Sequence, residues 1–248
     1  NQSQALSRMR FPQGWDTTKG EQGPVVVAIV DGGTQWQHGD LVGNVWTNPG
    51  ETPGNGLDDD GNGFADDVHG WNFANGTGDP TGLPATPQSA GHGTHVAGIA
   101  CAVTNNATGV AGASYNAKYM PICTSDPTTD LAIAFGYDGI VYAADNGADI
   151  VNCSWGGLGS ASAFEAEVIA YAYQQGTVVV AAAGNDNSIQ PSYPASYEHV
   201  FSVANVTNAD ARNASSNYGL TVDVSAQGTT IRSTYPTNTY ANLTGTSM

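Results

Sequence analysis

The sequence predicts an α/β fold built around a mainly parallel sheet. The apolar stretches are short, continuous and rich in β-branched residues, and helix-like stretches lie between them. Continuous apolar runs, as opposed to strict alternation, are typical of strands buried on both faces of a parallel sheet. Alternation of strand and helix along the chain indicates the same class of fold.

The expected elements follow in chain order. Strands are predicted at 25–30, 119–123, 149–154, 177–184 and 200–206. Helices are predicted at 94–103, 129–147 and 160–176. The last two end on Gly147 and Gly176, which are plausible C-caps because glycine readily adopts the left-handed conformation.

Residues 47–90 interrupt this alternation. The stretch is rich in Gly, Pro, Asn and Asp and shows little periodicity. A loop of this length inside a compact domain is usually functional or disordered. The 248 residues contain no internal repeat or linker, so we expect a single domain over 1–248 with an insertion at about 47–90.

The acidic composition of the chain limits the kinds of molecule that it can bind. Six Lys and Arg residues stand against 22 Asp and Glu residues, which gives a net charge of -16. Nucleic acid is an unsuitable partner, because its binding depends on cationic side chains that neutralise phosphates. No apolar run reaches the roughly 18 residues that a membrane span needs, so no membrane partner is expected either.

The three cysteines allow at most one disulfide within the chain. Cys123 and Cys153 each lie near the end of an apolar run, so neighbouring strands could bring them together. Three buried free thiols, with Cys101 as the third, are the alternative.

Polar residues that could carry chemistry follow the predicted strands. Asp31 ends an apolar strand, where α/β proteins place their sites, although a turn aspartate has the same pattern. His92 lies between two glycines at the start of a predicted helix. His95 follows it, but "HGTH" lacks the Glu and the i+4 His of a zinc-protease helix, which favours a structural role for His95. Asn185 follows another strand through a glycine, where an Asx-turn is the alternative reading, and Ser247 lies in "GTSM".

The order of these candidate residues along the chain matches that of a known class of enzyme. Asp, His and Ser occur in the chain order of subtilisin. The segments "AIVDGG", "NCSWGG", "AAAGN", "GHGTHVAG" and "GTSM" resemble those of the subtilisin-like serine proteases, from about residue 10 to 248. The resemblance implies a three-layer α/β/α fold. Gly32 departs from the family pattern, which usually has Ser or Thr there.

The resemblance also implies a role for each catalytic residue. Ser247 Oγ would be the nucleophile, and His92 would take its proton and return it to the leaving amine. Asp31 would orient the imidazole. Asn185 would donate to the oxyanion together with the backbone N–H of Ser247.

A substrate cleft is implied in the same way. Ser154, Trp155 and Gly156 would lie along the substrate backbone, with Trp155 near an outer pocket, although a core aromatic is an equal alternative. The small residues Ala182 and Gly184 suggest a roomy first pocket for apolar or aromatic side chains.

The acidic segment 57–67 predicts a calcium site. Asp58, Asp60 and Asn62 alternate around glycines, as in the first half of an EF-hand-like loop. The usual closing Glu is missing, so Asp67 is the simplest replacement, with the carbonyl of Phe64 as a further ligand. An Asx-rich turn and a disordered acidic loop are the alternatives.

Family resemblance implies a second calcium site. An Asp nine residues after the catalytic one and the loop after the His helix usually supply it, together with a Gln near the N-terminus. The matching residues here are Asp40, Asn106, the carbonyls of Thr104, Thr108 and Val110, and Gln2 or Gln4.

The sequence therefore predicts a secreted serine endopeptidase that is stabilised by two calcium ions, acts on proteins or peptides and is accompanied by its own propeptide. A catalytically silent fragment or binding module of the same fold is the alternative, and an ester hydrolase is a third class. The resemblance implies that the C-terminal part of the domain lies after Met248 and is needed for activity. We expect it as a second chain or as further residues of the same protein.

Overall fold

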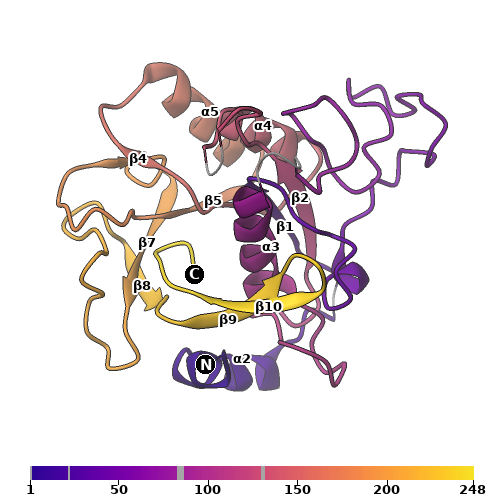
Figure 1. The fold of residues 1–248 in the computed structure, drawn as a ribbon. Coiled ribbons are helices and arrows are strands. Elements are labelled where there is room, and N and C mark those ends of the chain that lie inside the picture. The colour runs from indigo at the N-terminus through magenta and orange to yellow at the C-terminus, as the bar shows by residue number, and fades with distance from the viewer. Residues whose placement is uncertain (1, 22, 83–86, 130–131) are drawn as a thin grey trace.

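A six-stranded parallel sheet forms the centre of the protein (Figure 1). The computed structural model describes residues 2–21, 23–82, 87–129 and 132–248. The strand order is β2-β1-β3-β5-β7-β8, and every neighbouring pair is parallel. The strands are β1 (Val26–Asp31), β2 (Lys118–Cys123), β3 (Ile150–Cys153), β5 (Val178–Ala182), β7 (Val200–Val206) and β8 (Val224–Gln227).

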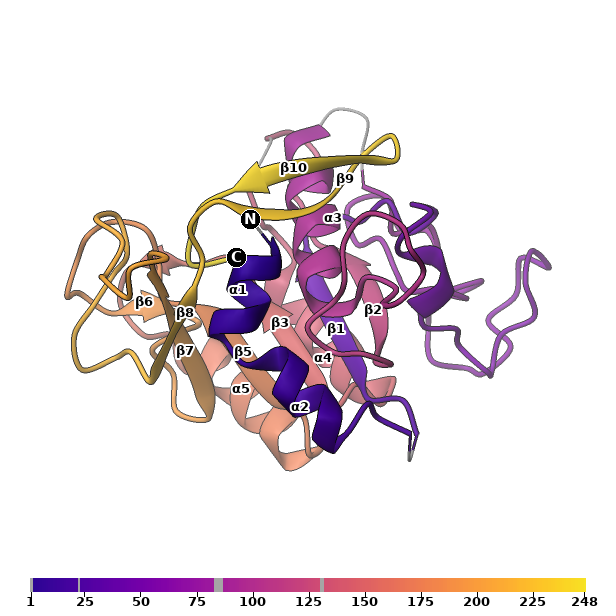
Figure 2. The same ribbon diagram turned by 90° about the horizontal axis from the view of Figure 1, so that it is seen from below.

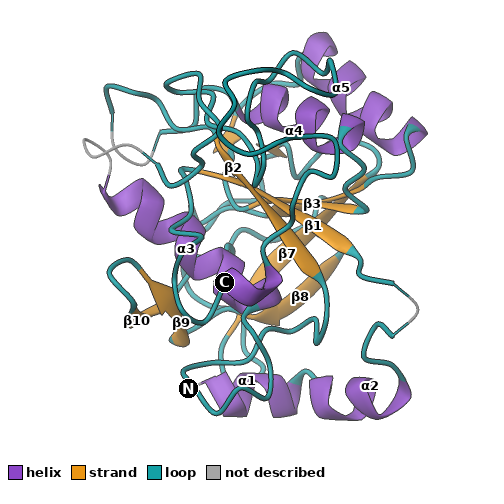
Figure 3. Ribbon diagram, turned by 90° about the vertical axis from the view of Figure 1, so that its right-hand side faces the viewer, coloured by secondary structure: helices purple, strands orange, loops and turns teal. Residues whose placement is uncertain are grey.

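Helices cover both faces of the sheet, which confirms the predicted three-layer α/β/α arrangement (Figure 3). Helix α3 (Pro87–Cys101) packs on one face, and α4 (Gly136–Asp145) and α5 (Ala163–Gln174) pack together on the other. The antiparallel pair β9 (Ile231–Tyr235) and β10 (Thr239–Leu243) lies against α3.

Smaller elements complete the fold. Helices α1 (Gln2–Arg8) and α2 (Phe11–Thr17) follow one another along the side of the molecule that faces the viewer in Figure 2. The remaining elements are a 3-10 turn, η1 (Val42–Asn44), and a two-stranded ladder of β4 (Gly157–Leu158) and β6 (Ser192–Tyr193). No helix among the described residues is long and apolar enough to cross a membrane.

Strand β1 shows why the predicted strands read as continuous apolar runs. Val27 and Ile29 join the core cluster that contains α3, whereas Ala28 and Val30 join the cluster under α4 and α5. Successive side chains of a strand point to opposite faces. Both faces are covered here, so every position must be apolar, and each fully buried Val or Ile contributes about 1.5–3 kcal/mol.

The two predicted C-caps are confirmed. Gly147 and Gly176 have φ values of 77° and 89°. Each donates its N–H to the carbonyl three residues earlier, and the following residue donates to the carbonyl five residues back, at 2.9–3.2 Å. These paired bonds form the Schellman motif, which satisfies the last carbonyls of α4 and α5.

The predicted boundaries differ from the structure mainly at helix starts. Helix α3 begins at Pro87, seven residues before the predicted start at Thr94, so His92 lies in its second turn. Its early glycines disfavour a helix locally, but tertiary packing overrides that preference. Helix α4 begins at Gly136, later than the predicted 129. The strands β8, β9 and β10 were not predicted, because their sequences mix polar and apolar residues on partly exposed faces.

The predicted loop at 47–90 contains no helix or strand element from 47 to 82, and α3 begins within its last residues. Its path is nevertheless defined by backbone hydrogen bonds at the edge of β2. Phe73 N–H donates to the Cys123 carbonyl, and Cys123 N–H donates to the Trp71 carbonyl, both at 2.9 Å. The loop thereby covers part of an edge strand that would otherwise expose unpaired backbone groups.

The cysteines do not form the disulfide that strand adjacency suggested. Cys123 lies on β2 and Cys153 on β3, and β1 separates these two strands. Cys101, Cys123 and Cys153 are all buried free thiols, which is the alternative that the sequence left open.

Candidate active site

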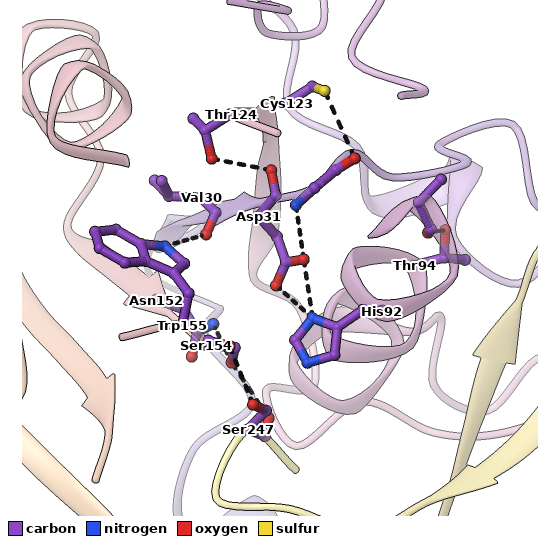
Figure 4. Close-up of polar contacts among 12 residues, drawn as sticks. Val30, Asp31, His92, Thr94, Cys123, Thr124, Asn152, Ser154, Trp155 and Ser247 are labelled. Atoms are coloured by element: carbon purple, nitrogen blue, oxygen red, sulfur yellow. Dashed lines mark hydrogen bonds and ion pairs between the residues drawn. The ribbon is translucent and has the colours of Figure 1, made fainter. Parts of the chain in front are cut away.

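The carboxyl ends of the central strands carry the predicted catalytic residues. Asp31 is the last residue of β1, and Asn185 follows β5 by three residues. His92 comes from α3 on one face of the sheet, and Ser247 comes from the chain end (Figure 4). Parallel strands end at the same edge, so residues far apart in sequence meet there.

Asp31 and His92 form a close pair. His92 Nδ1 lies 2.9 Å from both Oδ1 and Oδ2 of Asp31. Gly32 N–H donates to Asp31 Oδ1 at 2.7 Å. The Asp31 side chain is only 3 % exposed, whereas that of His92 is 25 % exposed. The carboxylate therefore holds the imidazole from behind and leaves the other ring nitrogen, Nε2, toward the pocket.

Glycines permit the helix to approach this closely. A Cβ on Gly93 would lie 2.2 Å from the Gly33 carbonyl oxygen and 3.1 Å from Asp31 Cβ. A Cβ on Gly91 would lie 2.6 Å from the Tyr235 hydroxyl. The glycines flanking His92 thus allow α3 to pack against the end of β1 on one side and against β9 on the other.

Gly32, the departure from the family pattern, has a steric cause. A Cβ at this position would lie 2.3 Å from the Cβ of Ser89, which is buried in the first turn of α3. A Ser or Thr at position 32 therefore does not fit while Ser89 occupies this place.

The pKa of His92 is raised above its usual range. Burial alone would lower the pKa, because it disfavours the charged imidazole. The charge of Asp31 and its hydrogen bond to Nδ1 outweigh burial and stabilise the protonated form. The pair is thus suited to accept and hold a proton.

His95 has a different environment. It is fully buried, and its Nε2 lies 3.1 Å from the carbonyl oxygens of both Ile231 and Ala241. Burial lowers its pKa to about 4. His95 therefore fastens α3 to the β9–β10 pair as a neutral imidazole.

Ser247 lies across the pocket from His92. Its Oγ donates to the Ser154 carbonyl oxygen at 3.1 Å, and Ser154 Oγ donates to the Ser247 carbonyl oxygen at 3.3 Å. Within the described residues Ser247 Oγ makes no hydrogen bond to His92 (Figure 4). Rotation about the side-chain bond of serine would redirect the hydroxyl, and such hydrogen bonds often tighten only when substrate is bound.

Two N–H donors lie near Gly245, in the turn that carries Ser247. Asn185 Oδ1 accepts from the backbone N–H of Thr246 at 3.0 Å and from its hydroxyl at 3.3 Å, which orients the amide group. Asn185 Nδ2 and the Ser247 backbone N both lie within 3.7 Å of the place that a Cβ on Gly245 would take. Neither nitrogen donates to another described residue, so both are available to a ligand oxygen.

A pocket of about 370 Å³ joins these groups. All the predicted substrate residues line it, namely Ser154, Trp155, Gly156, Ala182 and Gly184, together with Asp31, His92, Asn185 and Ser247. Ile133 and Asp186 also line the pocket. Sequence reasoning missed both, because Ile133 has no motif and Asp186 lies just beyond the matched "AAAGN".

Trp155 combines the two roles between which the sequence could not choose. Its indole N–H donates to the Val30 carbonyl at 2.8 Å, and its ring packs against the core cluster under α4. The same half-buried ring lines the pocket. Trp155 is therefore a wall of the pocket that the core holds in place.

The loop after β5 is supported by a residue that the sequence did not indicate. Asn217 Nδ2 donates to the Ala183 carbonyl at 2.8 Å, and its Oδ1 accepts from the N–H of Asp186 at 2.9 Å. Gly184 has φ 107°, and a Cβ there would lie 2.2 Å from Asn217 Nδ2. Only glycine fits at position 184, because any larger residue would collide with the Asn217 side chain.

The acidic loop brings three carboxylates together. Oxygen atoms of Glu51, Asp58 and Asp60 lie within 4.8 Å of one another, in the part of the chain that the structure describes, and could hold a metal ion. Asp58 accepts three backbone N–H groups at 2.8–3.1 Å, and Glu51 accepts those of Asp59 and Asp66 at 2.8–2.9 Å. Glu51 was not predicted, because it lies outside the alternating segment.

The oxygen donors and the uncompensated charge of this cluster fit a divalent cation such as calcium. None of the ion pairs among the described residues involves these three carboxylates. Unpaired like charges at this distance repel one another.

Asp67 and Asn62 occupy a neighbouring position. Asp67 is fully buried and accepts from Asn48 Nδ2 at 2.8 Å, Asn62 Nδ2 at 3.1 Å and the Tyr142 hydroxyl at 2.5 Å. Asn62 Nδ2 also donates to Asp60 Oδ2 at 3.3 Å, and Phe64 N–H donates to Asn62 Oδ1 at 2.8 Å. The predicted ligands thus lie side by side, but Asp67 is anchored to the core by Tyr142 and not gathered with Glu51 and Asp58.

Asp40 lies beside the loop predicted to share its cation. It is fully buried and accepts from Asn106 Nδ2 at 2.6 Å, from Val110 N–H at 2.8 Å and from the Tyr240 hydroxyl at 3.4 Å. No Lys, Arg or His side chain pairs with it among the described residues. The carboxylate and nearby amide and carbonyl oxygens are again of the kind that calcium prefers.

The remaining residues of this second set bond to the backbone or side chains of their neighbours. Gln2 forms two hydrogen bonds with the backbone of Ala111, one of them from Ala111 N–H to Gln2 Oε1 at 3.1 Å. Thr108 N–H donates to Asn106 Oδ1 at 3.0 Å, and Thr104 Oγ1 donates to the Ala102 carbonyl at 3.4 Å. Asn106 and Val110 thus contact Asp40 directly, and Gln2 contacts Ala111, the neighbour of Val110.

At the sheet edge, an imidazole bound to a buried carboxylate shares one pocket with a serine hydroxyl and two free N–H donors. This arrangement is that of the serine hydrolases.

Comparison with known proteins agrees. The subtilase family model matches residues 22–248. Thermitase of Thermoactinomyces vulgaris is 40% identical over 97% of this chain and 75% of its own length. The thermophilic serine proteinase of Bacillus sp. (strain AK1) is 39% identical over 94% of this chain and 51% of its own length. Halolysin of Haloferax mediterranei is 36% identical over 98% of this chain and 42% of its own length.

The chain belongs to the subtilase family, whose members are serine endopeptidases. It spans three quarters of the length of thermitase and about half or less of the length of the other two relatives.

Proposed function

We propose that this protein hydrolyses peptide bonds in proteins through an acyl-enzyme intermediate, with Ser247, His92 and Asp31 as the catalytic triad. The observation that carries the proposal is the Asp31–His92 pair, held at 2.9 Å across one pocket from Ser247. A raised imidazole pKa and a nearby hydroxyl are what general-base activation of serine requires.

The reaction would proceed in two halves. Ser247 Oγ attacks the carbonyl carbon of the scissile bond, and its proton passes to His92 Nε2 while Asp31 stabilises the imidazolium that forms. Asn185 Nδ2 and the Ser247 backbone N–H donate to the oxyanion. His92 then gives the proton to the leaving amine, and a water molecule releases the acyl group by the same steps in reverse.

Binding of an extended polypeptide is proposed along Ser154–Gly156. Main-chain hydrogen bonds to such a segment supply affinity, and side-chain pockets supply specificity. Small residues at Ala182 and Gly184 support a broad first pocket that accepts apolar or aromatic side chains. Asp186, which also lines the pocket, would allow basic side chains to be accepted as well.

Calcium is proposed as a structural ion at two sites. The first site would use Asp58 and Asp60 with Glu51 in place of the expected Asp67, because these carboxylates are the ones gathered together. The second would use Asp40 with Asn106 and neighbouring carbonyls. Neither ion takes part in a catalytic step. Calcium bound there would neutralise clustered carboxylates and stabilise the loops.

Secretion is proposed from the relatives, among which an extracellular protease of Xanthomonas campestris is 39% identical over 94% of this chain and 43% of its own length. A secreted subtilase would be accompanied by its own propeptide. The segment that the family places after the Ser motif would be needed for activity, whether it is supplied by the same chain or by a second one.

Covalent labelling tests the catalytic proposal. A fluorophosphonate probe should label Ser247 in the active enzyme, and Ser247→Ala should abolish both labelling and peptide cleavage. His92→Ala should reduce labelling strongly, because the hydroxyl loses its base. Labelling that persists in Ser247→Ala, or a complete lack of labelling in protein that cleaves peptides, would refute the proposed nucleophile.

A further inference from the structure

A second pocket adjoins the active-site pocket at Trp155. It has a volume of about 430 Å³ and shares Ile133, Trp155 and Gly156 with the first pocket. Its other walls come from the start of α4, the β4–β6 ladder and the first turn of α5, through Tyr137, Leu158, Tyr193 and Glu165. A polypeptide lying along Ser154–Gly156 would pass both pockets.

Glu165 places a carboxylate in this second pocket. Its Oε2 accepts from the Tyr137 hydroxyl at 2.8 Å and from the Tyr197 hydroxyl at 2.6 Å. Tyr197 is itself held by the Ser162 N–H, which donates to its hydroxyl at 2.9 Å. Two hydrogen bonds to a single oxygen fix the orientation of the carboxylate at the wall of the pocket.

The other carboxylate oxygen is available to a ligand. Oε1 of Glu165 accepts no hydrogen bond from a described residue, and none of the ion pairs in the described ranges involves Glu165. Burial and the Glu165 charge raise the pKa of both Tyr137 and Tyr197, so these two phenols stay protonated and keep donating to Oε2.

Aromatic rings surround the carboxylate. Tyr137 and Trp155 pack edge to face with centroids 5.5 Å apart, and both line the pocket together with Tyr193. Aromatic faces beside a carboxylate favour guanidinium and ammonium groups, because the ring quadrupole and the anion attract the same charge. An apolar side chain would instead remove Glu165 Oε1 from water without replacing its hydrogen bonds.

We propose that this second pocket selects an arginine or lysine side chain of the bound polypeptide, and that Glu165 is the specificity-determining residue. The selection rests on the proposed endopeptidase function. An extended chain advances about 3.3 Å per residue. The two pockets have different outer walls, so the selected side chain belongs to another residue than the one in the first pocket and is distinct from the residue at the cleaved bond.

Peptide cleavage with a matched pair of variants tests this inference. Internally quenched peptides would carry Arg, Lys, norleucine, Ala or Glu at each position near a fixed cleavage site, and kcat/KM would be measured for the active enzyme. We expect one position at which Arg or Lys exceeds norleucine by about five- to tenfold, the size of a partly exposed charge pair. The preference should shrink as salt is raised, because the pair is partly exposed to solvent.

Glu165→Gln should remove most of this preference. It keeps the size of the side chain and an acceptor for Tyr137 and Tyr197, so the ratio of kcat/KM between the Arg or Lys peptide and the norleucine peptide should fall toward one. Glu167→Gln is the matched control, because Glu167 is an exposed carboxylate on the same helix that does not line the pocket. It should leave the preference intact.

The outcomes separate this inference from the proposed function. Efficient cleavage of norleucine peptides with no basic preference, or a preference unchanged in Glu165→Gln, overturns the inference alone. If no peptide is cleaved, the proposed function fails, and binding of the same peptides to Ser247→Ala still decides the selectivity. Tighter binding of the Arg or Lys peptide than of the norleucine peptide supports the inference, and equal binding overturns it.

Discussion

The catalytic edge of the sheet and the acidic loop both contain carboxylates, but the groups that bind these carboxylates differ. Asp31 ends a core strand, is almost fully buried and is paired with His92. Asp58 and Asp60 lie on an exposed loop without helix or strand, where backbone N–H and amide groups are the main donors to them. The first carboxylate has a partner that can become cationic, whereas the second group has no cationic partner among the described residues.

The difference shows how one chain uses carboxylates in two ways. A buried carboxylate next to an imidazole costs desolvation but shifts the imidazole pKa, which serves chemistry. Clustered exposed carboxylates repel one another and gain little from surface hydrogen bonds, so a cation is the natural way to stabilise them. The catalytic edge should therefore respond to mutation in activity, and the acidic loop should respond to ions in stability.

The largest expected effect is at the catalytic edge. Asp31→Asn keeps the shape of the side chain but removes the charge that holds His92 in the correct tautomer. We expect kcat to fall by about 10⁴, the loss known for the same change in other serine proteases. Thermal unfolding of the variant should differ little from wild type, and a loss of activity smaller than tenfold would contradict the assigned role.

The pH profile checks the same pair. His92 must be neutral to act as a base, so kcat/KM should fall as pH falls through its pKa, which Asp31 raises above the usual 6.5. In Asp31→Asn the residual activity should persist to lower pH, because the stabilising charge is gone. An acid limb at the same pH in both proteins would show that Asp31 does not control the imidazole.

The next effect concerns the oxyanion donors. Asn185→Ala removes Nδ2 while the Ser247 N–H remains. The loss in kcat should be about 10²–10³, a magnitude taken from subtilisin's own oxyanion asparagine. Because the bond strengthens only in the transition state, KM should change little. A rise in KM with kcat unchanged would instead mark Asn185 as a substrate-binding residue.

A smaller effect is expected at the acidic loop. Chelation of calcium should lower the melting temperature by several degrees, since a ligand that binds only the folded state stabilises it. Measurements on Ser247→Ala avoid self-digestion. Asp58→Asn combined with Asp60→Asn should reduce this sensitivity, whereas Asp16→Asn, on the exposed face of α2, should not. Equal melting temperatures with and without chelator would count against both sites.

The smallest effect is an acid-induced loss of stability at His95. Its folded-state pKa of about 4 lies below the unfolded value of 6.5, so the unfolded chain binds more protons between these values. Stability is fully present above pH 6.5 and is lost as pH falls toward 4. His95→Gln should flatten this part of the stability curve, as measured by denaturant unfolding, and a curve as steep in this variant as in the wild type would contradict the role of His95.

The sequence predicted secondary structure correctly where the conformation depends on neighbouring residues in the chain. The five predicted strands and the caps at Gly147 and Gly176 follow from apolar runs and from the left-handed conformation that glycine allows. It failed for the start of α3 and for β8 to β10, where packing against other elements decides the conformation. Periodicity contains no signal for such contacts.

The same distinction between sequence and tertiary structure applies to the candidate active site. The sequence alone determined which residues could act, because the motifs around Asp31, His92, Asn185 and Ser247 carry their chemistry in their residue types and order. The tertiary structure decided what each of these residues touches. It placed Glu51, in preference to Asp67, with Asp58, and it set Glu165 beside the active-site pocket. The physical reason is that side chains far apart in sequence meet only when strands and helices pack, and their charges and hydrogen bonds depend on that meeting.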